Sequence, residues 1–214
     1  YRHPELYLLL LPTIIYFLVF HYIPMYGVQI AFRDYIPGRA ILDNEWIGLE
    51  NFKRFFNSYL CIPVITNTLR ISILGLILGF PFPILLAIML NELKNLKLKK
   101  TVQTISYAPH FISTVAMAGI ILVFLSDRGL INVIMATLGI EKIQFMANPR
   151  YFAWIYVISN IWKSAGWGSI IYIAAISSID PELYEAARVD GATKIQKIMH
   201  IDIPSIVPTM VTLL

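Results

Sequence analysis

Cysteine and charge are both scarce in this sequence. Cys61 is the single cysteine among 214 residues, which excludes a disulfide within the chain and any multi-cysteine metal site. Charged residues make up 14% of the chain, against about 25% in an ordinary soluble domain. The net charge of +4 is small and scattered, so it does not support binding to nucleic acid.

Patterns that carry chemistry are also missing from the sequence. No GxxxxGK[ST] phosphate loop occurs, so the chain itself should not bind ATP in the P-loop manner. No serine or cysteine is accompanied by a plausible acid-base relay. The histidines lack metal-ligand spacing; they are His3, His21, His110 and His200. We therefore expect no catalytic residue, no metal and no cofactor.

Apolar residues are abundant and come in long blocks. They make up 57% of the chain, and several blocks reach the length that crosses a bilayer. We predict four complete spans and the start of a fifth, at 6–23 (with continuation to 32), 67–90, 105–125, 152–176 and 205–214. Glycine and proline inside such blocks favour helices over barrel strands. The predicted fold class is an all-α, polytopic transmembrane bundle. Because the chain starts at Tyr1 rather than Met and stops inside an apolar run, we expect a fragment.

Lysines in one short loop predict the orientation. Residues 92–101 carry Lys94, Lys97, Lys99 and Lys100, which favours the cytoplasmic side. Alternation then places the amino terminus and residues 177–204 inside. It places residues 33–66 and 126–151 outside. Over the whole chain the positive-inside bias is weak.

A short polar segment lies between the last two apolar blocks. Asp180 is a good N-cap, and Pro181 suits the first position of a helix. Gly191 can end that helix in the left-handed conformation, and Thr193 can cap a second helix. Pro204 marks the return to apolar sequence. The pattern predicts two short helices joined at Gly191.

The same segment resembles the EAA signature of ABC importer permeases. The match is Glu185-Ala186-Ala187, three residues, Gly191, nine residues, Ile201, one residue, Ile203-Pro204, with Ile203 where the family usually has Leu. Asp190 and Ala192 also match the form common in the sugar-importing branch. The resemblance implies that 177–204 is a cytoplasmic loop that docks on an ATPase. The implied coupling residues are Glu185, Ala186, Ala187, Asp190, Gly191, Ile201 and Pro204.

The resemblance covers nearly the whole chain and is closest to type I, binding-protein-dependent permeases of the oligosaccharide branch. It implies about six spans in full length, of which four and a half lie in a single transmembrane permease domain at 1–214. Implied partners are ABC ATPase subunits, a second permease subunit in a heterodimer, an extracellular solute-binding lipoprotein and the lipid bilayer. ATP hydrolysis would belong to the ATPase. The implied location is a bacterial inner (plasma) membrane.

Two cations lie inside predicted spans. Arg70 is near the assigned outer end of its span, so it can reach headgroups or water. Lys163 lies about 17–20 Å from either end of its span, too far for a lysine side chain to bridge. A polar and aromatic stripe on its helix would suit hydrogen bonding and stacking with a sugar; it comprises Tyr156, Asn160, Lys163, Ser164 and Trp167. A clamp between helices remains the alternative. Residues 162–168 look like the fourth-span region of oligosaccharide-importer permeases, which favours the substrate pathway.

The outer loop 33–66 is long enough to have structure of its own. Residues 46–52 resemble the entry to a short amphipathic helix in sugar-importer permeases. Two interpretations stay open, a cap over the bundle and a docking surface for the binding protein. Two other functions are also possible for the chain as a whole. They are a secondary transporter that uses Lys163 in ion coupling and a membrane scaffold that recruits a cytoplasmic partner. The sequence does not identify the sugar or its length.

Overall fold

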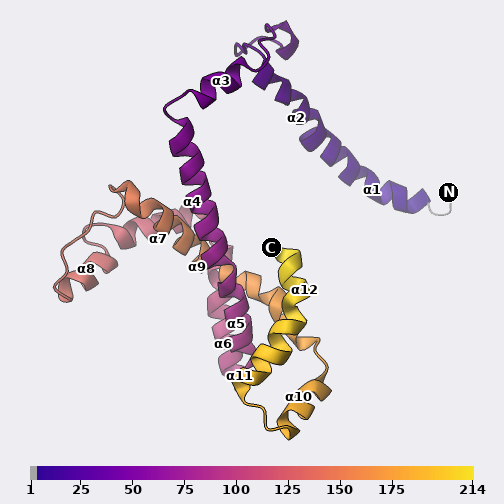
Figure 1. Ribbon diagram of the computed structural model, residues 1–214, viewed down its shortest axis with the longest axis vertical. Helices are drawn as coiled ribbons and strands as arrows, with labels where there is room; N and C mark the ends of the chain where they lie inside the picture. Colours follow the sequence, from indigo (N-terminus) through magenta and orange to yellow (C-terminus); the bar gives the residue numbers. More distant parts are fainter. Residues whose placement is uncertain (1–3) are drawn as a thin grey trace. The chain divides into compact units, whose positions relative to one another are not determined.

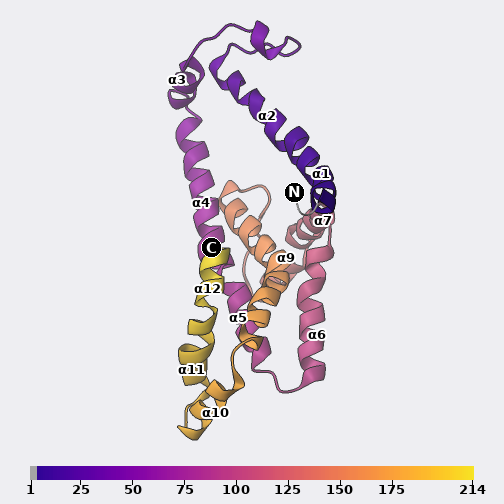
Figure 2. The ribbon, with the colours of Figure 1, turned by 90° about the vertical axis from the view of Figure 1, so that its right-hand side faces the viewer.

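A computed structural model describes residues 4–214, and every named element in that range is a helix (Figures 1 and 2). The prediction of an all-α fold is confirmed. His3 lies outside the described residues. The chain divides into two compact units, Tyr1–Asn67 and Thr68–Leu214, and each is described by itself.

The first unit opens with a helical path that runs as far as Phe32. Its parts are α1 (Pro4–Phe17), η1 (Leu18–Tyr22), α2 (Ile23–Met25) and η2 (Tyr26–Phe32). Pro24 has no N–H for the carbonyl of Phe20, and η1 accommodates this with a wider, π-helical turn. The predicted continuation of the first span to residue 32 is confirmed.

The segment after this helix folds around Asn44, which is buried. The Asn44 side chain accepts a hydrogen bond from the Ile36 N–H at 2.9 Å and donates one to the Ala40 carbonyl at 2.8 Å. The Arg33 guanidinium donates to the Asn44 carbonyl at 2.7 Å. The rings of Phe32 and Trp46 stack, with centroids 5.4 Å apart. Residues 33–66 therefore have a structure of their own, as predicted.

The short helix predicted after Gly48 is present as α3 (Glu50–Phe56). Gly48 has φ +60°, a conformation that side chains rarely adopt, and the chain turns there into the helix. The Asn51 amide donates to the carbonyls of Ala31 and Arg33 at 3.2 and 3.0 Å. These bonds hold α3 against the end of η2, and a short 3₁₀ turn, η3 (Ile41–Asp43), completes the segment.

The second predicted span is helical and is interrupted at one residue. It consists of α4 (Cys61–Gly79) and α5 (Pro81–Asn91), which meet at Phe80. Pro81 and Pro83 lack the N–H groups that would continue the hydrogen bonds of α4, so the backbone hydrogen bonding is interrupted there. The prediction of a helix over 67–90 is confirmed apart from this break.

Two boundaries in the next segment were predicted wrongly. The expected loop 92–101 is largely helical, because the Asn95 side chain caps α6 (Leu96–Tyr107) by accepting from the N–H groups of Lys97 and Leu98. The expected span 105–125 is not one helix. After α6 comes a 3₁₀ turn, η4 (Ala108–Phe111), and Ser113 then caps α7 (Thr114–Leu125). Pro109 and the Ser113 cap end the backbone hydrogen bonding of α6, although the apolar sequence continues. The expected outer loop 126–151 contains a further helix, α8 (Leu130–Thr137).

The fourth predicted span is α9 (Pro149–Ser177), a single helix of 29 residues. It packs against α5, α6 and α12 (Ile203–Leu213) in the second unit (Figure 2). The buried core between α5, α9 and α12 contains Ile84, Ala87, Ile88, Tyr172, Ile176 and Ile206. At Gly166, α9 passes so close to α6 that an added Cβ would overlap the Ser106 carbonyl.

Three segments of the described chain are long and apolar enough to cross a membrane. They are Glu5–Phe32, Cys61–Asn91 and Thr114–Thr137. Helix α9 is long enough but falls outside this set. Polar residues such as Asn160 and Lys163 lower its hydropathy, so its crossing of the membrane remains a prediction.

Candidate coupling loop and transmembrane groove

The polar segment between α9 and α12 folds as two helices joined at Gly191. The first is α10 (Pro181–Val189), and the Asp180 carboxylate caps it by accepting from the Glu182 N–H at 3.0 Å. Gly191 has φ +74°. These features confirm the predicted cap and the predicted glycine turn.

The end of α10 shows why three residues separate Ala187 from Gly191. The Ala192 N–H donates to the Ala187 carbonyl at 2.9 Å, and the Gly191 N–H donates to the Arg188 carbonyl at 3.2 Å. This pair of bonds is the Schellman motif, in which a left-handed residue follows the last helical turn. The spacing between the alanine pair and the glycine is therefore set by helix termination.

The second helix begins at Thr193, also as predicted. The Thr193 and Gln196 side chains form a capping box at the start of α11 (Lys194–Lys197). From there η5 (Ile198–Asp202) leads without a break into α12. Pro204 lies in the first turn of α12 and has no N–H to donate to the His200 carbonyl. The π-helical turn η5, which contains His200, directly precedes this position. The predicted fifth span thus begins as a continuation of the loop's second helix.

A depression of about 340 Å³ lies between α10 and the second helix. Ala187, Asp190, Gly191 and Ile201 line it together. Glu185, Ala186 and Pro204, the other residues singled out from the sequence, are exposed and do not line it. Figure 1 shows α10 beyond the end of α12 in the second unit.

Two residues that were not singled out from the sequence connect α10 to η5. The Tyr184 hydroxyl donates a hydrogen bond to Oδ1 of Asp202, whose side chain is fully buried. The other Asp202 oxygen has no hydrogen-bond partner within the described residues. Burial, the hydrogen bond to Asp202 and the negative charges of Asp202 and Glu92 raise the pKa of Tyr184. Tyr184 therefore stays a hydrogen-bond donor at neutral pH.

An ion pair makes a second link in this region. The Lys194 ammonium, at the first position of α11, lies 3.7 Å from the Glu92 carboxylate at the end of α5. Both side chains are partly exposed, so the pair contributes little stability by itself. Together with the Tyr184 bond, it orients α10 and α11 against the helices of the core.

A separate groove of about 730 Å³ lies between α7, α9 and the segment that precedes α9. Tyr156, Asn160 and Lys163 line it, as three members of the stripe singled out from the sequence. The aromatic rings of Phe152 and Tyr156 stack along one side, with centroids 6.1 Å apart. The groove combines an aromatic wall with a few polar groups, which is the usual make-up of a small-molecule site.

Lys163 lies at the end of this groove nearest the start of α7. Its ammonium donates a hydrogen bond to the Thr114 hydroxyl at 3.0 Å. Within residues 4–214, no carboxylate lies within ion-pairing distance of Lys163. Thr114 was not singled out from the sequence, because only the fold brings it beside Lys163.

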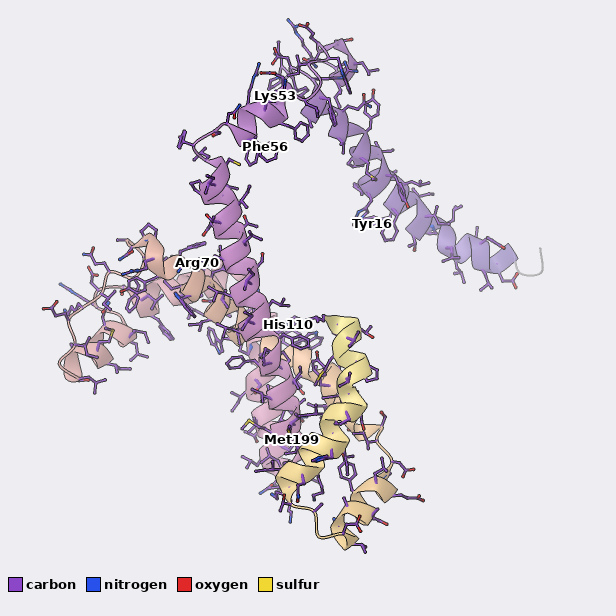
Figure 3. All side chains as sticks on the ribbon, viewed as in Figure 1. Tyr16, Lys53, Phe56, Arg70, His110 and Met199 are labelled. Carbon is purple, nitrogen blue, oxygen red and sulfur yellow. The ribbon has the colours of Figure 1, made fainter. Side chains whose placement is uncertain are left out.

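The remaining two members of the stripe lie elsewhere. The Ser164 hydroxyl donates to the Asn160 carbonyl at 2.6 Å, within its own helix. The Trp167 ring stacks on His110 with centroids 4.6 Å apart and meets Phe111 edge-on at 5.5 Å. Neither lines the groove. His110, labelled in Figure 3, belongs to η4, so this stack fixes the turn between α6 and α7 against α9.

Residues 79–214 match the family model of the binding-protein-dependent transport system inner membrane component. The chain belongs to this family. The match begins at the end of α4 and includes the groove, the Gly191 turn and α12. The chain is therefore part of a multi-pass inner-membrane protein.

Known proteins similar to the chain agree with this assignment. It is 47% identical over 210 residues to the polygalacturonan/rhamnogalacturonan transport system permease protein YteP of Bacillus subtilis (strain 168), covering 98% of this chain and 65% of YteP. It is 41% identical to Protein LplB of the same organism, covering 100% of this chain and 67% of LplB. The chain thus spans about two thirds of the length of these relatives.

A solved structure shares the fold. It is a bacterial ABC transporter involved in the import of the acidic polysaccharide alginate. The TM-score is 0.89 at 49% identity, over 99% of this chain and 71% of the matched chain. The same transporter type has been solved in complex with an alginate pentasaccharide-bound periplasmic protein, with a TM-score of 0.89 at 48% identity.

Proposed function

We propose that this chain is the membrane-spanning permease subunit of an ATP-driven ABC importer. The importer moves an oligosaccharide that an extracellular binding protein delivers. Membership of the binding-protein-dependent family supports the class of transport. The named substrates of YteP and of the alginate importer support a carbohydrate cargo.

The observation that carries this proposal is the exposed helix α10. Val189 is 88% exposed and Leu183 is 50% exposed, although both are apolar, and both lie on α10. A short helix that presents apolar side chains beside small ones suits insertion into a groove of a partner. We assign that groove to a cytoplasmic ATPase, which carries out the hydrolysis.

The turn and helices that follow α10 connect the docking helix to the rest of the bundle. The Schellman turn at Gly191 fixes the angle between α10 and α11, and η5 continues into α12. Movement of α10 with the ATPase would therefore move α12 as well. Glu185, Ala186 and Ala187 transmit force in this scheme and do no chemistry.

The other partners follow from the same proposal. A second permease subunit completes the bundle, and a solute-binding lipoprotein docks on the outer side. Residues 33–66 suit that docking, since Trp46 and Leu49 are 57% and 60% exposed in this folded segment. The amino terminus and residues 177–204 then lie in the cytoplasm.

The substrate pathway in this proposal is the groove beside α9. Tyr156 and Asn160 face it and offer a ring and an amide to a sugar. Ser164 and Trp167 support α9 from outside the groove. The pathway role of Lys163 is developed in the next subsection.

Uptake by the complete complex tests the function. Proteoliposomes that contain both permease subunits, the ATPase and the binding protein should accumulate labelled oligosaccharide only when ATP is supplied to the ATPase side. Uptake driven by an ion gradient without ATP would instead indicate a secondary transporter.

A matched pair of variants tests the docking role of α10. Val189→Asp places a charge on an exposed apolar position and should abolish copurification of the ATPase while the permease still inserts in the membrane. Leu42→Asp makes the same kind of change at a position that is 60% exposed in the segment 33–66, and it should leave ATPase binding unchanged. Equal ATPase binding in both variants would contradict the assignment.

A further inference from the structure

We propose that Lys163 binds a carboxylate of the transported sugar, so that the cargo is an acidic, uronate-containing oligosaccharide. This inference rests on the proposed function, because it assumes that the groove beside α9 carries substrate. It adds a charge requirement and a specific residue.

The first step is the charge of the groove. Among the described residues that line it, Lys163 is the only charged one. Its only hydrogen bond within the described residues goes to the neutral hydroxyl of Thr114. Among the described residues, no carboxylate balances the positive charge of this groove.

The second step is the cost of that arrangement. An ammonium in the middle of a membrane-spanning helix is costly unless an anion or a hydrogen-bonding group compensates it. Thr114 is the first residue of α7, and the positive end of the α7 dipole makes the position less favourable for a cation. A salt bridge inside the protein would be the ordinary compensation. Since the described residues do not supply one, we take an anionic ligand as the partner of Lys163.

The third step is the fit of the remaining wall. The stacked pair of Phe152 and Tyr156 gives a flat apolar surface of the kind that sugar rings cover. Asn160 lies one helical turn from both Tyr156 and Lys163. The three groups match a uronate residue. The aromatic wall suits the apolar face of the sugar ring, the amide suits its hydroxyls, and the ammonium suits its carboxylate.

The competing explanation is a clamp between α9 and α7 that uses Lys163 only through Thr114. The two explanations differ in what removal of Thr114 does. A clamp needs the hydroxyl, so Thr114→Val should reproduce the effect of losing the lysine. Ligand binding needs the ammonium, so Thr114→Val should leave recognition of the carboxylate intact.

Equilibrium binding to the assembled complex in nanodiscs, without the binding protein, tests the proposal directly. The probes are labelled α-1,4-trigalacturonate and its carboxyl-reduced counterpart, α-1,4-galactotriose. The wild type should bind the acidic trisaccharide at least about tenfold more tightly at low salt, and the difference should shrink as salt is raised. Equal affinities, tighter binding of the neutral sugar, or no binding of either sugar would overturn the proposal.

Variants identify the residue responsible. Lys163→Met should remove the difference between the two sugars, Lys163→Arg should keep most of it, and Thr114→Val should keep it. Arg70→Met is the matched control, because it removes a membrane-embedded cation from α4 outside the groove (Figure 3). A difference that persists in Lys163→Met, or is lost in Arg70→Met, would contradict the assignment.

Failure of this inference can be separated from failure of the proposed function. ATP-dependent uptake of a neutral oligosaccharide, with no preference for the acidic one, would leave the importer intact and remove the charge requirement. Absence of any ATP-dependent oligosaccharide uptake by the wild-type complex would remove both.

Discussion

Tyr184 and Asp202 join the two helices of the polar segment across 18 residues of sequence. Tyr184 lies in the middle of α10, whereas Asp202 is the last residue of η5 and directly precedes α12. Their hydrogen bond therefore connects a helix on the surface to one that enters the core. Because one Asp202 oxygen is already without a partner in the described residues, loss of the bond would leave the whole buried carboxylate unpaired.

Removal of the Tyr184 hydroxyl should destabilise the coupling region. Tyr184→Phe keeps the ring but leaves a buried acceptor unsatisfied, which costs about 1–3 kcal/mol. For a chain of this size the Tm should fall by about 2–4 °C per kcal/mol, measured by thermal unfolding of the purified complex. ATPase stimulation by substrate should fall more than basal ATPase activity, because the link between α10 and α12 is weakened. An unchanged Tm would show that the bond contributes nothing.

The same variant has an expected pH dependence. The pKa of Tyr184 is raised in the fold above the ordinary value of 10.0. Both states are protonated below about pH 10, so the stabilising contribution is fully present there. It is lost as the pH rises through the raised pKa. The Tm difference between wild type and Tyr184→Phe should therefore stay constant from about pH 7 to pH 9. A difference that disappears within this range would contradict the direction of the shift.

The turn at Gly191 should tolerate few side chains. Gly191→Val forces a β-branched residue into φ +74° and should strain the Schellman turn. We expect normal membrane insertion with loss of substrate-stimulated ATPase activity in the assembled complex. Gly191→Asn is the comparison, because asparagine adopts the left-handed conformation more readily, and it should retain more stimulation. Full stimulation in a well-expressed Gly191→Val complex would refute the coupling role.

Helix termination explains how much of this region the sequence could predict. The caps at Asp180 and Thr193 and the turn at Gly191 depend on residues within one or two helical turns. Such local rules can be read from the sequence. The Tyr184 bond depends on how α10 folds back against η5, which no local pattern specifies. Asp202 did offer one signal, since it is a carboxylate immediately before an apolar run.

The break between α6 and α7 shows the opposite case. Residues 105–125 form one apolar block in the sequence. The hydropathy of these residues does not show where the backbone hydrogen bonds of a helix end. Pro109 and the Ser113 cap decide that boundary. The groove was predictable only in part, because the helical spacing placed Tyr156, Asn160 and Lys163 on one face. The diversion of Trp167 into a stack with His110 depends on tertiary packing.

Helices α6 and α9 should be able to approach this closely only because Gly166 has no side chain. Gly166→Ala adds a methyl group that overlaps the Ser106 carbonyl, and a backbone cannot move aside cheaply. We expect a destabilisation of about 1–3 kcal/mol and a lower Tm of the complex. Gly75→Ala is the matched control, because no atom outside its own stretch of helix backbone lies within 4 Å of its added Cβ among the described residues. It should be neutral or slightly stabilising through helix propensity. Equal Tm values for the two variants would contradict the contact.

The side of the membrane on which α10 lies decides the coupling proposal. Single cysteines in a Cys61→Ala background can report it through labelling with a membrane-impermeant thiol reagent in intact cells. The fold guides the choice of positions. Asn95 and Thr193 cap helices and should be left in place, whereas Lys94 and Val189 are exposed and make no cap. Asp43, which is exposed in the segment 33–66 of the first unit, reports the opposite side.

Cysteines at Lys94 and Val189 should resist the reagent in intact cells and react after permeabilisation. Protection of Val189 by bound ATPase would be relieved when the ATPase is stripped away. A cysteine at Asp43 should react from outside at once. The lysines on α6 and the docking role of α10 both require this result, because cations are retained in the cytoplasm and ATP is hydrolysed there. Labelling of Val189 from outside, with Asp43 protected, would mean that α10 cannot reach an ATPase, and the importer assignment would fall with it.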